Sequence, residues 1–88
     1  MIIKQASNTR KVLANNIVHF RLQNGWSQEE FAYKLKSTAS YVSALENAKR
    51  NIRVDYVDHI AKTLKVEVTE LFENRDKIDN HRLPRRYF

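Results

Sequence analysis

Glycine and proline each occur only once in this 88-residue chain, at Gly25 and Pro84. Folds built from many short strands need these residues in their turns, so the sequence excludes a turn-rich β-sandwich and a low-complexity linker. A chain of this length forms one domain at most, and it has too little interior for a large catalytic cleft. With 42% hydrophobic residues it is still expected to fold. The composition therefore indicates one small folded domain, and the helical spacing of its apolar residues predicts that it is all-α.

The charge of the chain is strongly positive and unevenly placed. Lys and Arg number 16 against 10 Asp and Glu, giving a net charge of +6, which indicates a polyanionic partner such as nucleic acid or an anionic membrane. Residues 1–54 carry nine basic and three acidic side chains, residues 55–74 two and five, and residues 75–88 five and two. The net charges are thus +6, −3 and +3, so one face is expected to meet the polyanion and a second, acidic segment to serve another surface.

The residues that usually build catalytic or metal sites are missing or scattered. Cysteine is absent, and His19, His59 and His81 have no spacing typical of zinc ligands. The paired carboxylates fall at helix starts, where capping explains them. No stretch approaches the roughly 20 apolar residues that span a bilayer. We expect no enzyme activity, no cofactor, no metal, no small-molecule ligand and no membrane partner, and a cytoplasmic, nucleoid-associated location.

Hydrophobic spacing and helix-stop signals predict five helical segments. The first ends at Asn24-Gly25, where glycine takes a positive φ without cost. The fourth has Asp55 and Asp58 in its first turn and lysines at its end, which matches the helix dipole. The fifth is short and apolar. The segments cover residues 9–23, 28–35, 38–46, 54–65 and 66–72.

The start of the second segment carries the clearest local signal. Ser27 and Glu30 have the spacing of a capping box, in which each side chain accepts the backbone amide of the other residue. Trp26 and Phe31 take the two positions of a hydrophobic staple around that cap. Trp26 is therefore interpreted as a packing residue in preference to a ligand platform.

The third segment has two different faces. Thr38 is placed to cap it, and Val42 and Leu45 are predicted to point into the core. Turning by 100° per residue puts a small, polar set on the opposite face, a composition that buries poorly but allows close approach to another surface. This set is Ser40, Ser43, Ala44 and Asn47, with Ala39 and Tyr41 on the flanks.

Residues 25–32 and 41–51 resemble the lambda-repressor-like Xre/Cro family of transcriptional regulators, and the similarity spans about residues 13–72. The resemblance implies a compact five-helix domain in which the second and third helices form a helix-turn-helix. The family usually has glycine at the positions of Lys36, Ala48 and Lys65. Lys36 must then either adopt a left-handed conformation, at a cost of about 1–2 kcal/mol, or use a different turn.

The resemblance also implies which residues contact DNA. Residues expected to face the bases are Thr38, Ala39, Ser40, Tyr41, Ser43 and Ala44. Residues expected near phosphates are Gln28, Lys36, Asn47, Lys49, Arg50, Asn51 and Arg53. Packing is an equally good interpretation of Tyr41. Plain solvation is the alternative for Gln28 and the default interpretation of Lys36 and Arg53.

The family often pairs the positions of Arg21 and Glu46 in a buried or half-buried ion pair. Arg21 lies on the Ile17 and Phe20 side of the first helix, and Glu46 lies on the inner flank of the third. The resemblance therefore implies a structural salt bridge between them.

The leading functional hypothesis is a homodimeric, sequence-specific regulator of transcription that binds a palindromic or nearly palindromic operator in double-stranded DNA. The run from Tyr41 to Asn51 is similar to controller proteins of restriction-modification systems, in which a flexible tyrosine and nearby basic residues touch DNA. The alternative is an antitoxin-like autorepressor whose C-terminal tail binds a partner protein. A nonspecific nucleoid or RNA-binding protein is a weaker alternative.

The predicted organisation is an N-terminal arm (1–8), the DNA-binding domain (9–73) and a basic tail (74–88). Three interpretations of the tail are open from the sequence: disorder, an arm that contacts DNA, and a segment that binds a partner protein. The acidic, partly apolar segment 55–74 is the expected dimer surface, with Val66, Val68, Leu71 and Phe72 as its candidate contacts.

Overall fold

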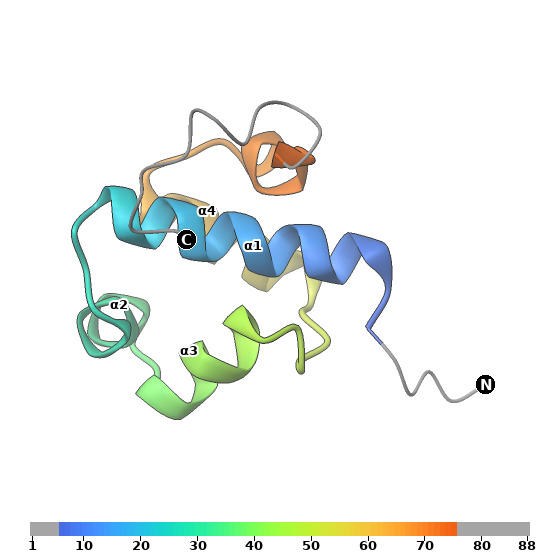
Figure 1. The fold of residues 1–88 in the computed structure, drawn as a ribbon. Coiled ribbons are helices and arrows are strands. Elements are labelled where there is room, and N and C mark those ends of the chain that lie inside the picture. The colour runs from blue at the N-terminus through green and yellow to red at the C-terminus, as the bar shows by residue number, and fades with distance from the viewer. Residues whose placement is uncertain (1–5, 76–88) are drawn as a thin grey trace.

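The computed structural model describes residues 6–75, and within this range the backbone forms four α-helices and one 3-10 helix, with no strand (Figure 1). The all-α prediction is confirmed, but the fifth segment is a tight 3-10 helix that begins at Val68, two residues later than predicted. Most of the predicted tail lies outside the described residues. The elements are α1 (Asn8–Gln23), α2 (Gln28–Leu35), α3 (Ala39–Glu46), α4 (Val54–Leu64) and η1 (Val68–Phe72).

Helix α1 is the central element of the domain. It contacts η1 on one side and α3 on another, while α2 packs against α3 and α4 (Figure 1). All five elements contribute to one core, in which each fully buried large apolar side chain stabilises the fold by about 1.5–3 kcal/mol. The core side chains are Leu13, Ile17, Phe20, Phe31, Ala32, Leu35, Val42, Leu45, Val57, Ile60, Ala61, Leu64 and Leu71.

Both ends of α1 have identifiable caps. The Ser7 hydroxyl accepts the Arg10 amide at 3.1 Å, so the helix begins at Asn8, inside the predicted N-terminal arm. Gly25 follows the other end with φ of 76°, as predicted. The Asn24 side chain donates to the Leu64 carbonyl at 3.3 Å and so joins this end to the end of α4.

The predicted start of α2 is confirmed in detail. The Glu30 amide donates to the Ser27 hydroxyl and the Ser27 amide to the Glu30 carboxylate, both at 3.0 Å. The rings of Trp26 and Phe31 stack with centroids 6.1 Å apart, and the Lys34 ammonium lies 4.9 Å from the Trp26 ring. Trp26 is a packing residue, as the staple pattern predicted.

Within residues 6–75, three non-glycine residues adopt the left-handed conformation. Their φ angles are 60° at Lys36, 57° at Ala48 and 64° at Lys65. These are the three positions at which the family usually has glycine, and each lies just after a helix. These turns are therefore left-handed although no glycine occupies them, which costs about 1–2 kcal/mol of strain at each position.

One apolar position of α4 does not join the core. Val54 is 84% exposed, although its spacing matches that of Val57, Ile60 and Leu64, which are buried. Val54 is the first residue of the helix, directly after the N-cap residue Arg53, whose side chain makes no capping hydrogen bond. Helical spacing alone would place Val54 on the buried face, but the structure leaves it exposed.

Leu71 belongs to the core of the monomer, so its assignment to the dimer surface was wrong. Its side chain is completely buried, because η1 lays it against α1, whereas Val68 and Phe72 are 37% and 40% exposed. Val66 is partly buried against the same core. Of the four candidates, only Val68 and Phe72 offer substantial apolar surface to another molecule.

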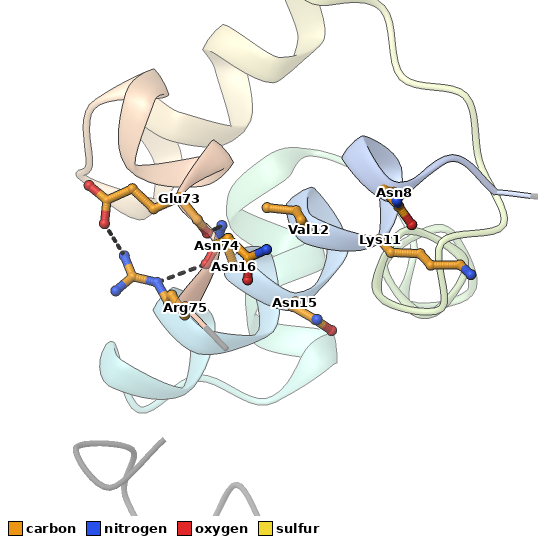
Figure 2. Close-up of a pocket in the computed structure, with 8 residues that line it drawn as sticks. All are labelled: Asn8, Lys11, Val12, Asn15, Asn16, Glu73, Asn74 and Arg75. Carbon is orange, nitrogen blue, oxygen red and sulfur yellow. Dashed lines mark hydrogen bonds and ion pairs between the residues drawn. The ribbon is translucent and has the colours of Figure 1, made fainter. Parts of the chain in front are cut away.

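Asn16 ties the end of the described chain to α1. Its amide nitrogen donates to the carbonyls of Leu71 at 2.7 Å and Glu73 at 2.8 Å, and its oxygen accepts from Arg75 Nε at 2.7 Å. The Arg75 guanidinium also lies 4.6 Å from the Phe20 ring. Asn16, Glu73 and Arg75 are among the residues that line a hollow of about 400 Å³. Figure 2 shows their side chains close together. Arg75, placed by the sequence in the tail, thus contacts the domain.

Candidate nucleic-acid interface

Helices α2 and α3 form the helix-turn-helix that the sequence predicted. Ala32 is buried in the core, and its carbonyl accepts the Ser37 amide at 2.9 Å after the left-handed turn at Lys36. The Thr38 hydroxyl then accepts the Tyr41 amide at 3.1 Å and begins α3. The connection between the two helices is therefore fixed by local hydrogen bonds.

The faces of α3 divide as the spacing predicted. Val42 and Leu45 are completely or almost completely buried. Thr38, Ser40 and Asn47 are exposed, while the rest of the set expected to face the bases is half-buried: Ala39, Tyr41, Ser43 and Ala44. Two of the polar groups are already engaged, the Thr38 hydroxyl in the cap and the Asn47 amide on the Ser43 carbonyl at 2.8 Å. Ser40 carries the second exposed hydroxyl of this face.

Tyr41 packs against α4. Its ring meets the edge of Tyr56 at a centroid distance of 5.8 Å, and the Arg50 guanidinium lies 5.0 Å from the Tyr41 ring. Tyr56 in turn packs against His59, whose Nε2 lies 3.1 Å from the Leu35 carbonyl oxygen. Burial raises the pKa of Tyr56 above 10.0, the Tyr41 phenol adds to the rise, and a hydrogen bond with Ser37 opposes it. This aromatic stack connects α3 to α4 and places Arg50 beside α3.

Arg21 and Glu46 form a bidentate ion pair behind this surface. Arg21 Nε lies 2.5 Å from Glu46 Oε2, and the two side chains are 11% and 5% exposed. Gln28 Nε2 donates to the other carboxylate oxygen, Oε1, at 2.9 Å. One amide hydrogen of Gln28 is thus directed to Glu46, which leaves the second hydrogen and the carbonyl oxygen for any phosphate contact.

Most of the residues assigned to phosphates gather in and around the connection between α3 and α4. Lys49, Arg50, Asn51 and Arg53 are all exposed within eight residues of the end of α3, and Lys36 is exposed at the turn before it. These residues border the exposed side of the helix-turn-helix. A polyanion that lies along α3 would meet positive charge on both flanks.

Arg10 also contacts the connection between α3 and α4, and the sequence did not predict this role for it. From α1 it donates to the Ala48 carbonyl at 3.1 Å and to the Asn51 side-chain oxygen. Its partners lie 38 and 41 residues away in the chain. No periodicity or capping pattern connects residues so far apart, so the sequence carried no signal for these contacts.

Within residues 6–75, no group of three or more His, Cys, Asp or Glu side chains converges in a way that would hold a metal ion. Over the same part of the chain, no helix combines the length and apolar character needed to cross a membrane.

A comparison with protein-family models matches residues 19–71 to the helix-turn-helix family, and this match includes α2, α3 and α4 in full. The chain belongs to this family of DNA-binding transcription regulators. A hypothetical transcription factor of Neisseria meningitidis serogroup B is 40% identical over 62 residues, which cover 70% of this chain and 58% of that protein. This chain thus matches less than two thirds of that relative.

Restriction-modification control proteins are also similar to this chain. Control protein C.MunI of a Mycoplasma species is 35% identical over 51 residues, covering 58% of this chain and 69% of the control protein. The controller C.Esp1396I, solved as a tetramer with its natural 35 base-pair operator, superposes with a TM-score of 0.69 and 31% identity, over 81% of this chain and 93% of that one. The resemblance seen in the sequence is confirmed at the level of the family.

Proposed function

We propose that this protein is a sequence-specific transcriptional regulator that binds double-stranded DNA as a homodimer on a pseudopalindromic operator. The observation that carries this proposal is the division of α3 into a buried face and an exposed, small-residue face with basic residues on both flanks. A single α3 reaches only a few base pairs, so two copies related by a two-fold axis would read half-sites about one helical turn apart. The proposed role is regulatory and cytoplasmic, with no enzyme activity.

Two sets of residues have different roles in the proposed complex. The base-facing set is Thr38, Ala39, Ser40, Tyr41, Ser43 and Ala44. Because Ala39 and Ala44 offer only methyl groups, hydrogen bonds to bases are expected mainly from the hydroxyls of Ser40, which is exposed, and Ser43, which is half-buried. Affinity comes mainly from the phosphate set: Gln28, Lys36, Asn47, Lys49, Arg50, Asn51 and Arg53.

The proposed dimer contact is formed by Val68 and Phe72 of η1, since Leu71 is committed to the monomer core. Replacing both residues with Glu should convert the dimer to monomer in sedimentation experiments at tens of micromolar protein. The matched control is Tyr33→Glu, which changes an 82% exposed aromatic residue on α2. If the unaltered protein sediments only as a monomer, with and without operator, the homodimer is excluded.

Restriction-modification control is the regulatory role that the comparisons favour. Several of the similar proteins are controllers, and one of them was solved on its operator. In that role, genes for a methyltransferase and an endonuclease should lie next to the gene of this protein. A neighbouring gene for a small toxin would instead support an antitoxin-like autorepressor.

Selection of bound duplexes from a random pool tests the central proposal. The expected product is a set of duplexes with two inverted half-sites at constant spacing, which would establish specificity and two-fold binding together. Retention of all sequences equally would contradict sequence-specific regulation and favour nonspecific binding.

A further inference from the structure

Arg10 connects the first helix to the segment that follows the reading helix. Its Nη1 donates to the Ala48 carbonyl at 3.1 Å, and its Nη2 donates to Asn51 Oδ1 at 2.5 Å. The Arg10 amide is itself held by the Ser7 hydroxyl, at 3.1 Å, in the cap of α1. The guanidinium therefore reaches across from a fixed helix start to two points of the connection between α3 and α4.

That connection has few backbone hydrogen bonds of its own. The Lys49 amide donates to the Ala44 carbonyl at 2.9 Å, and within residues 6–75 the next backbone hydrogen bonds along the chain are those to the Arg53 carbonyl at the start of α4. Residues 50–53 are thus held by side-chain contacts: Arg10 on Asn51, Arg50 on the Tyr41 ring, and Ile52 against the core. Three of the proposed phosphate contacts lie in this short stretch.

The contact from Arg10 also determines which end of the Asn51 amide is available. A side-chain amide has one oxygen that accepts and one nitrogen that carries two donor hydrogens. Arginine has only donors, so it engages the Asn51 oxygen and leaves the nitrogen for an acceptor. A phosphate oxygen is such an acceptor.

We propose that Arg10 is a positioning residue for DNA binding, which holds residues 48–51 and orients Asn51 so that its amide nitrogen meets a phosphate oxygen. This inference rests on the proposed function, because it concerns the same DNA surface. Arg10 acts through the geometry of its two hydrogen bonds, and its positive charge alone is insufficient to hold the connection. A lysine in its place keeps the charge but loses the planar fork that reaches two acceptors at once.

The experiment compares Arg10→Lys and Arg10→Met with the control Lys11→Met in binding to one selected duplex. Lys11 is the next residue of α1, is exposed, and carries the same charge. Loss of hydrogen bonds from a charged donor should weaken binding about tenfold in both Arg10 variants, and less than about twofold in the control. Urea melts establish that each variant is folded under the binding conditions.

A role through Asn51 requires coupling between the two residues. Asn51→Ala should weaken binding in the parent protein and have little further effect in the Arg10→Lys background. Wild-type affinity in Arg10→Lys would overturn the proposal in favour of a simple charge effect. Additive losses in the double variant would overturn the route through Asn51.

Amide hydrogen exchange in the DNA-free protein separates this inference from the proposed function. Faster exchange at the amides of Ala48 and Lys49, which donate to the carbonyls of Leu45 and Ala44, is expected in Arg10→Lys if Arg10 holds the connection, while the amides of α1 stay unchanged. If the parent protein selects no duplex, the proposed function fails, but hydrogen exchange still shows whether Arg10 holds the connection between α3 and α4. If the parent binds a selected duplex but exchange and affinity are unchanged in Arg10→Lys, only the positioning role fails.

Discussion

The guanidinium of Arg21 on α1 holds the carboxylate of Glu46 at the end of α3 through two contacts, Nε to Oε2 at 2.5 Å and Nη2 to Oε1 at 3.0 Å. Arg21 Nη1 also donates to the Trp26 carbonyl at 2.7 Å, just before α2 begins. One ion pair therefore connects the central helix to both helices of the helix-turn-helix. Both charges are almost fully buried, so neither can be left without the other.

Replacing Arg21 with Met should lower the free energy of unfolding by about 3–5 kcal/mol, because the Glu46 carboxylate would remain buried and unpaired. Urea denaturation measures this loss. The double variant Arg21→Met with Glu46→Leu should recover much of the stability, since both buried charges are then absent. Lys11→Met, on the exposed side of α1, should change stability by less than about 0.5 kcal/mol. A single Arg21→Met variant as stable as the parent would contradict a structural role.

Lys65→Gly should stabilise the protein by about 0.5–1 kcal/mol. The backbone at this position has a φ of 64°, a conformation that is strained for lysine and unstrained for glycine. The comparison is Lys62→Gly, three residues earlier inside α4, which should lose about 1 kcal/mol. Thermal or urea melts of the two variants should therefore move in opposite directions. A loss of stability in both would show that Lys65 is not strained.

The capping box of α2 should contribute to the acid sensitivity of the fold. The Ser27 backbone amide, followed by its hydroxyl, lowers the pKa of Glu30 below its ordinary value of 4.5. A lowered pKa in the folded state means that the stabilisation is present above pH 4.5 and is lost as the pH falls through the folded-state value. In Glu30→Gln, the drop in stability on acidification should be smaller than in the parent. The neighbouring residue Glu29 lies outside the capping box. The Glu29→Gln variant should therefore lose as much stability on acidification as the parent does.

Lys49 and Lys65 should differ in their effect on the salt dependence of DNA binding. Lys49 follows α3 on the proposed phosphate-contacting side, and Lys65 follows α4, outside the helix-turn-helix. Lys49→Gln should reduce the slope of log affinity against log salt by about 0.9, the value for one lost phosphate contact. Lys65→Gln should leave the slope unchanged. Equal slopes in the two variants would remove Lys49 from the phosphate set.

Features that depend on neighbours three or four residues apart could be predicted from the sequence. The capping box at Ser27 and Glu30, the staple at Trp26 and Phe31, and the inward pair Val42 and Leu45 all formed as expected. Their geometry follows from helix periodicity, so the spacing of residues was enough to recognise the helix-turn-helix and its exposed face. The ion pair of Arg21 and Glu46 was expected only because the family resemblance placed the two positions together.

The tertiary structure alone decided which long-range contacts these helices make. It buried Leu71 against α1, left Val54 exposed, directed Gln28 to Glu46, and brought Arg10 to Ala48 and Asn51. Each contact depends on how helices pack across many intervening residues, and hydrophobic spacing does not encode that arrangement. The sequence by itself thus determined the helices, their caps and the side of α3 that faces outward. The packing of α1 against the other elements decided which side chains support that surface and which remain free to meet a partner.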